Sequence, residues 1–253
     1  MFSIQKWLAL AIIFLITPFV GVKAQEDDNQ LKFNVSADLV SSYVWRGMYQ
    51  TGASIQPTLG LSIAGFSFTL WGSTDFDGNI SSDGTASKEI DMTATYTLGN
   101  SGLTLSIADL WWPGQNSGKY FNFKSHETDH HFEAGLAYIL PVEKFPLSLS
   151  WYTMFAGQDK NVTVNKGHQN YSSYVELNYP FNVKMVNLNV ICGMVPYKAP
   201  QYNTNGFAVT NVSLKGSMDI KITNSFSVPI FAQAIWNPRM EDAHFVFGLT
   251  LRP

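Results

Sequence analysis

The sequence predicts an all-β protein: a transmembrane, antiparallel, up-and-down β-barrel of about twelve strands, preceded by a cleaved signal peptide. Three observations lead to this prediction. The chain begins with a short apolar leader, apolar and polar residues then alternate in segment after segment, and the links between segments are alternately short and long. Charged residues make up only 14% and aromatic residues 14%, whereas about 25% of a typical soluble domain is charged.

The leader has the features of a secretory signal. Lys6 precedes the apolar run 7–22, and Ala24 stands just before the acidic start at 25–28. The run is shorter than the roughly 20 residues that a membrane-spanning helix needs, so cleavage is favoured over a retained anchor. We therefore expect export through the Sec pathway, with residues 1–24 as signal peptide and residues 25–253 as the barrel.

The charge and the cysteine content narrow the class further. The chain has a net charge of −3, which becomes about −5 when Lys6 and Lys23 leave with the signal. No basic tract is present, so nucleic acid is not an expected partner. Cys192 is the only cysteine, so no internal disulfide can hold the fold. Backbone pairing and packing must do so.

The alternation has the period of a β-strand. Ile90, Met92 and Ala94, for example, are separated by Asp91 and Thr93. Because successive strand side chains point to opposite faces, each such segment has one apolar and one polar face. We expect about twelve strands of roughly 9–12 residues, long enough to cross a bilayer when tilted. The pattern is seen at 31–45, 55–63, 66–70, 90–98, 103–107, 130–140, 147–155, 169–179, 186–195, 207–220, 226–235 and 244–251.

The links between these segments alternate in length. Tight links are expected at 64–65, 99–102, 141–146, 180–184 and 221–225, and long polar links at 46–54, 77–87, 112–129, 156–168, 197–206 and 237–243. Short turns at one end, long loops at the other and an even strand number are typical of an outer-membrane barrel. The alternative, a soluble β-sandwich, gives no reason for long loops at one end throughout. We therefore expect the cell outer membrane, with both termini in the periplasm.

Aromatic residues are expected to form two belts at the membrane interfaces. Those near the long links are Tyr43, Trp45, Phe76, Trp111, Phe155, Tyr171, Phe207 and Trp236; those near the short links are Phe66, Tyr96, Phe145, Tyr179, Phe181 and Phe226.

The first expected hairpin also resembles a known family. Residues 42–47 (SYVWRG) and 56–60 (QPTLG) lie where TorF-type porins and related outer-membrane β-barrel proteins of Gram-negative bacteria have an S-x-Y-x-x-R-G strand and a following Gln-Gly-Leu-like strand. The rest of the chain matches that family in hairpin layout alone. The resemblance implies an outer-membrane location and a porin-type barrel more than a substrate. The chain departs from many such barrels at Pro253, where they end in an aromatic residue.

Strand parity assigns charged side chains to the barrel interior. The lumen-lining candidates are Asp38, Arg46, Asp75, Glu89, Asp91, His131, Glu133, Glu176, Lys215 and Asp219, together with Arg252. Acids outnumber bases, and a narrow carboxylate-lined lumen favours cations or neutral polar solutes over anions. The alternative is that these charges pair across the small interior and close it.

Arg46 is expected at the mouth of the first strand. Its guanidinium is suited to bridging Asp38, Asp75 or a neighbouring acid, because it presents several donors in a fixed plane. A fixed ion pair is favoured over a ligand contact, since buried charges are rarely unpaired.

Catalytic signals are weak. His126, Glu127 and His130 fit the H-E-x-x-H zinc motif, but in a strand residues four apart are about 13 Å from each other, too far to share one metal. A looser divalent-metal site that also uses Asp129 is the alternative. No G-x-S-x-G motif is present, and Cys192 falls on an apolar face. We expect no catalytic residue, no metal and no cofactor.

Together these inferences predict a monomeric, porin-like channel for passive diffusion of small polar or cationic solutes, not an enzyme. The expected partners are outer-membrane lipid and lipopolysaccharide, the small solutes themselves, and the barrel assembly machinery during insertion. Two alternatives are a structural or adhesive barrel with a closed lumen and an outer-membrane lipid-modifying enzyme.

Overall fold

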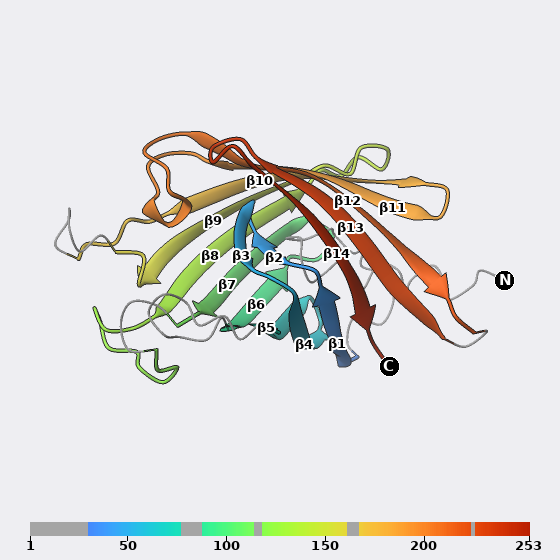
Figure 1. Cartoon of the computed structure of the whole chain (residues 1–253), viewed down its shortest axis with the longest axis horizontal. Helices are drawn as coiled ribbons and strands as arrows, with labels where there is room; N and C mark the ends of the chain where they lie inside the picture. Colours follow the sequence, from blue (N-terminus) through green and yellow to red (C-terminus); the bar gives the residue numbers. More distant parts are fainter. Residues whose placement is uncertain (1–29, 77–87, 114–117, 161–166, 224–225) are drawn as a thin grey trace.

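A computed structural model describes residues 30–76, 88–113, 118–160, 167–223 and 226–253. The expected signal peptide lies outside these residues. Twelve strands form a closed antiparallel barrel in which neighbours in sequence are neighbours in the wall (Figure 1), which confirms the predicted fold class. The wall strands are β1 (Lys32–Val40), β4 (Ser54–Ile63), β5 (Phe66–Asp75), β6 (Lys88–Thr97), β7 (Leu103–Trp111), β8 (His130–Ile139), β9 (Ser148–Gly157), β10 (Ser173–Val183), β11 (Val186–Val195), β12 (Ala208–Lys221), β13 (Ser227–Asn237) and β14 (Asp242–Leu251).

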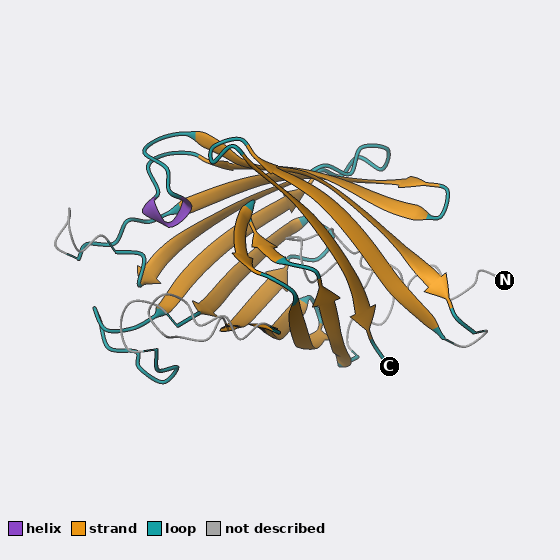
Figure 2. Ribbon diagram, in the orientation of Figure 1, coloured by secondary structure: helices purple, strands orange, loops and turns teal. Residues whose placement is uncertain are grey.

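The barrel closes where the first strand meets the last. β1 pairs with β14 from Ala37 opposite Leu251 to Val40 opposite Gly248, and with β4 along its other edge. Closure removes the unpaired strand edges, which is what lets a sheet exist in lipid. The described loops contain one short 3₁₀ helix, η2 (Pro200–Tyr202), shown in purple in Figure 2. In the described parts of the chain, no helix has both the length and the apolar character needed to cross a membrane.

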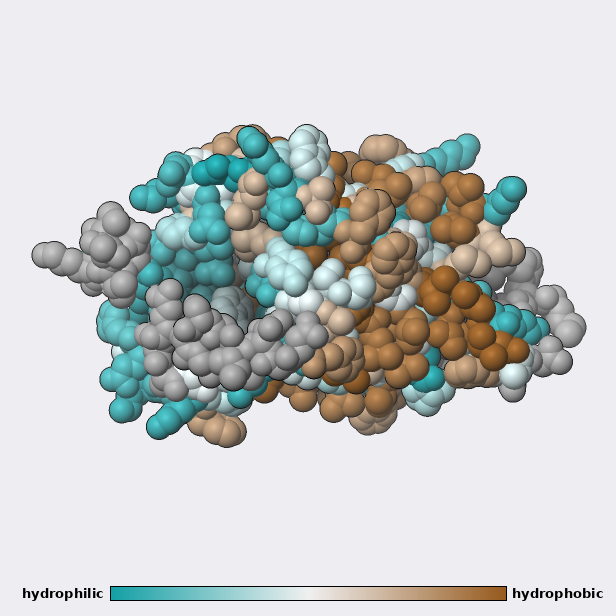
Figure 3. Space-filling model, viewed as in Figure 1, coloured by the Kyte–Doolittle hydropathy of each residue, from teal (hydrophilic) through white to brown (hydrophobic). Residues whose placement is uncertain are grey.

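The two faces of the wall follow the alternation in the sequence. In β9, Leu149 and Trp151 are exposed, whereas Ser150 and Tyr152 are buried. Large apolar side chains are exposed on most of the other strands as well, and they form a hydrophobic surface over the strands towards the short-turn end (Figure 3, brown). The end that carries the long loops is hydrophilic (teal). An apolar outer band bounded by polar loops is the surface expected of a barrel in a membrane.

Two expected boundaries were wrong. The first strand ends at Val40 rather than at 45, because the chain leaves the wall and forms a separate antiparallel pair, β2 (Tyr43–Trp45) and β3 (Met48–Thr51). The turn expected at 180–184 also lies later, since β10 continues through Pro180 to Val183. Proline is tolerated there because β9 pairs with β10 only as far as Asn178, so Pro180 lies on an open edge.

Candidate functional site in the barrel interior

The β2–β3 hairpin folds into the barrel instead of projecting from it. Figure 1 shows the pair, in blue, across the middle of the molecule. The tip of the hairpin reaches the wall on the side of β12 and β13, where the Asn237 amide at the end of β13 donates a hydrogen bond to the Gly47 carbonyl at 3.0 Å. Asn237 is 190 residues away in sequence, so the hairpin joins segments that are distant along the chain.

The turn at the tip is set by its two residues. Trp45 pairs with Met48, which leaves Arg46 and Gly47 as a two-residue loop, with φ of 50° and 83° respectively. Two consecutive positive φ values are characteristic of the type I′ turn that favours glycine. A Cβ atom on Gly47 would lie 1.9 Å from the carbonyl oxygen of Thr210. Glycine is therefore required here both for the turn and for the close contact with the wall.

Arg46 is held by a carboxylate on the far side of the interior. Its two terminal nitrogens donate to the two oxygens of Glu133 on β8, at 2.6 and 2.7 Å. The Arg46 and Glu133 side chains are 12% and 6% exposed. Paired planar hydrogen bonds of this kind are among the strongest that side chains form. The expected partners Asp38 and Asp75 were wrong, because the inward fold of the hairpin carries Arg46 beyond the mouth of β1.

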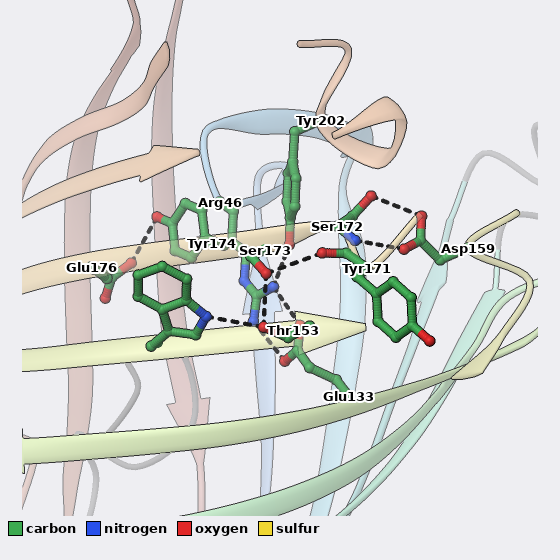
Figure 4. Close-up of polar contacts among 11 residues, drawn as sticks. Arg46, Glu133, Thr153, Asp159, Tyr171, Ser172, Ser173, Tyr174, Glu176 and Tyr202 are labelled. Atoms are coloured by element: carbon green, nitrogen blue, oxygen red, sulfur yellow. Dashed lines mark hydrogen bonds and ion pairs between the residues drawn. The ribbon is translucent and has the colours of Figure 1, made fainter. Parts of the chain in front are cut away.

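Aromatic rings surround the Arg46 guanidinium. Its carbon atom lies 4.6 Å from the centre of the Trp45 ring, 4.7 Å from Tyr152 and 4.8 Å from Tyr174, all within range of cation–π attraction. A further hydrogen bond joins Arg46 to the Tyr202 hydroxyl (Figure 4). The Tyr202 ring stacks on Trp45. This cage fixes the guanidinium in one position.

The charge of Arg46 is secure in this setting. Burial by itself lowers the pKa of a guanidinium, but Glu133 and the neighbouring tyrosine hydroxyls outweigh it, so the pKa of Arg46 lies well above its ordinary value. Burial also raises the pKa of Tyr202, which keeps its hydroxyl protonated. Arg46 and Glu133 therefore form a buried ion pair that anchors the hairpin in the interior.

A second carboxylate lies beside this anchor. The Tyr174 hydroxyl donates to Glu176 at 2.8 Å, and the Asn211 amide donates to the Tyr174 oxygen at 3.2 Å. The other Glu176 oxygen, Oε1, is buried without a hydrogen-bond partner in the described part of the chain. Glu176 therefore places a second carboxyl group close to the Arg46 pair.

Several other predicted lumen residues are buried on the wall. Asp38 accepts a hydrogen bond of 2.6 Å from Thr250, and Glu89 is hydrogen-bonded to Tyr43 of the hairpin. Asp75 and Asp91 each keep one buried carboxylate oxygen for which the described residues offer no hydrogen-bond partner.

The remaining candidates lie further from the anchor. His131 stacks on Trp112 with ring centres 4.2 Å apart, and the Lys215 ammonium lies 4.2 Å from the centre of the Phe231 ring. Asp219 pairs with Arg252 at 3.4 Å. Asp219 is exposed near the short-turn end, so this pair is not part of the packed interior.

The H-E-x-x-H residues do not form a metal site. His130 is fully buried, its Nδ1 lies 2.7 Å from Asp109, and its Nε2 is hydrogen-bonded to the Tyr120 carbonyl. The residues that the structure describes contain no group of three or more His, Cys, Asp or Glu that could hold a metal ion. The His130 contacts hold the β7–β8 loop against the wall instead.

The loop between β9 and β10 is fixed by one carboxylate. Asp159 accepts hydrogen bonds from the Ser172 backbone and hydroxyl, both at 2.7 Å (Figure 4). Burial raises the pKa of Asp159 even though these bonds act in the opposite direction. This contact orders the loop that leads into the Tyr174 strand.

The interior site includes residues that the sequence interpretation missed. Tyr152 and Tyr174 share strand parity with Ser150 and Glu176, so inward aromatic positions were visible in the pattern. Tyr202, on the η2 turn, and Thr210, which contacts the hairpin tip, gave no such signal. Of the predicted belt, Tyr43 and Trp45 were wrong, because both belong to the inward hairpin.

Comparisons with known proteins show little beyond this architecture. No family model matches the sequence, and no curated protein sequence matches it. Among solved structures, the chain is similar to OmpF of Salmonella typhi, determined in complex with daunomycin. That match has a TM-score of 0.37 and 9% identity, and it covers 92% of this chain and 100% of the other. A likeness this distant carries no argument about function, and the fold rests on the strand pairing described above.

Proposed function

We propose that the protein is an outer-membrane channel for small polar or cationic solutes. The observation that carries the proposal is the excess of carboxyl groups over basic groups on the inner face of the wall. Within the described residues, Asp75, Glu89, Asp91 and Glu176 take part in no ion pair, whereas Arg46 is neutralised by Glu133. A ring of carboxylates in a narrow pore attracts cations and repels anions.

The hairpin makes the outer half of the interior the narrow part of this channel. On the inner face of β4, Ser54, Gln56 and Thr58 are buried, whereas Lys215 and Ser217 on the periplasmic half of β12 are partly exposed. Solutes that enter from outside therefore meet the hairpin before they reach the wider half. A solute can pass through the outer half only when the hairpin moves aside.

The resemblance of residues 42–47 to the TorF-type porins supports the same proposal. In this chain that motif lies on the hairpin itself and includes Arg46 and Gly47. The first part of the resemblance therefore lies on the segment that narrows the interior, whereas its second part, residues 56–60, lies in the wall strand β4.

A structural or adhesive barrel is the second candidate. The observation that favours it is the close packing of Arg46 between three aromatic rings, which closes the outer half. A lipid-modifying enzyme has less support. The ring nitrogens of His130 are both engaged by Asp109 and Tyr120, so this histidine is not free to activate a nucleophile.

The ion selectivity of the purified protein in a planar bilayer tests the proposal. With a potassium chloride gradient across the bilayer, we expect a reversal potential that indicates preference for potassium over chloride. The double variant Glu89→Gln/Asp91→Asn removes two inner-face carboxylates, so we expect the preference to fall. Glu143→Gln, on an exposed carboxylate of the short link between β8 and β9, serves as a control with little effect. Anion preference, or no current at any voltage, would contradict the proposal.

A further inference from the structure

A cavity lies on the outer side of the hairpin, between it and the long loops. Its volume is about 290 Å³. We call it the outer cavity, and its walls come from the hairpin, from β6, from the loops after β7 and β11, and from the start of β14. Residues that line it include Tyr43, Trp45, Glu89, Trp112, Asp242 and His244. A space of this size is at the small end of ligand pockets and holds a compact molecule rather than a chain.

The walls of the outer cavity are rich in aromatic faces. Trp45 and Trp112 contact each other with ring centres 6.3 Å apart and planes inclined at 54°. On the other side, Tyr49 and His244 lie 5.8 Å apart. Aromatic faces that meet at an angle around a small space are the arrangement by which proteins recognise ammonium groups.

The outer cavity is lined by carboxyl groups. Glu89 and Asp242 line it, and none of its described lining residues is a lysine or an arginine. Glu89 is hydrogen-bonded to Tyr43, while Asp91, two residues along β6, keeps a buried oxygen with no hydrogen-bond partner in the described chain. The Asp242 side chain is 55% exposed and therefore accessible to a ligand. Asp242 lies 3.3 Å from His244, and a cation placed in this space gains from both carboxyl groups without displacing a lysine or an arginine.

We propose that the outer cavity binds a small organic cation, a compact primary or quaternary ammonium compound. Aromatic faces supply the contact surface for its apolar groups, and Glu89 and Asp242 balance its charge. The proposal rests on the cavity itself and does not require that the barrel conducts ions. The binding test and the conductance test can therefore give different outcomes.

Choline and its uncharged counterpart of the same shape, 3,3-dimethylbutan-1-ol, provide the test. Binding to the full-length mature protein in detergent micelles is measured by saturation-transfer NMR titration. We expect saturable binding of choline, at least about tenfold tighter than that of the neutral alcohol. Equal affinity for the two compounds, or no saturable binding of either choline or tetramethylammonium, would overturn the proposal.

Variants show whether binding occurs in the outer cavity. Trp112→Leu and Glu89→Gln each remove one recognition element and are expected to weaken choline binding about tenfold. Glu241→Gln alters an exposed carboxylate next to Asp242 that does not line the cavity, and it should bind choline as the unaltered protein does. Far-ultraviolet circular dichroism verifies that each variant is folded. If both cavity variants fold and bind choline with unchanged affinity, the assignment is wrong.

Discussion

The Arg46–Glu133 pair contributes to the hairpin's position because both charges are buried. Their paired hydrogen bonds compensate for the loss of water around two ions, whereas removal of one partner leaves the other charge unbalanced. Measured costs of breaking a buried pair in this way are about 3–5 kcal/mol. By contrast, the Lys124–Glu127 pair is 77% and 61% exposed, and pairs of that kind contribute less than about 1 kcal/mol.

Glu133→Gln is therefore expected to release the hairpin. The amides of residues 43–51 should exchange with deuterium much faster, by the equivalent of about 3 kcal/mol of lost protection, as measured by mass spectrometry of the protein in micelles. Lys124→Gln, on the exposed pair, is the control and should leave their exchange unchanged. Unaltered protection of the hairpin in Glu133→Gln would show that the ion pair does not hold it.

Gly47→Ala tests the same anchor through sterics. The added methyl group meets the Thr210 carbonyl and places a Cβ on a left-handed residue, which costs about 1–2 kcal/mol before any clash. We expect the tip to leave the wall and the single-channel conductance to rise. Gly206→Ala is the matched control, since its added Cβ meets nothing within 4 Å. The same conductance in both variants would contradict the claim that the contact of Gly47 with the wall holds the hairpin in the interior.

The sequence does not indicate which carboxylate pairs with Arg46. Glu133 is 87 residues from Arg46, and strand parity indicates only that such a carboxylate faces inward. Parity says nothing about which strands lie opposite each other across the interior. Tyr152 and Tyr174 could have been identified, because they occupy inward positions of their strands.

At the scale of elements, the wall strands follow from the sequence and the hairpin does not. Alternation and turn residues are local, so most of the wall strands could be recognised without information from distant parts of the chain. The ends of β1 and β10 were misplaced, and β5 and β7 extend beyond the expected segments 66–70 and 103–107. The segment after Val40 continues the same alternation through Tyr43 and Trp45, which is why it was interpreted as wall. Its departure depends on contacts of Gly47 with Thr210 and Asn237, which no local pattern reveals.

At the scale of the whole molecule, a closed hydrogen-bonded wall predicts a distinctive response to heat. Each wall strand is paired with a neighbour on both sides, and the chain contains one cysteine, so we expect the barrel to resist detergent without any covalent crosslink. We expect the unheated protein to migrate as a compact species on a sodium dodecyl sulfate gel and the boiled protein to migrate near its full mass. Identical migration of the two samples would contradict a closed barrel.

The most direct test of the account compares the conductance of the intact protein with that of a protein that lacks the hairpin. Val40 pairs with Ser54 in the wall, so residues 42–52 can be replaced by an Asn-Gly turn, which suits a two-residue link between antiparallel strands. In the same bilayer and salt, we predict a several-fold larger, cation-preferring conductance for the shortened protein. Equal conductance of the two proteins, or no current through either, would contradict the claim that the hairpin constricts a channel.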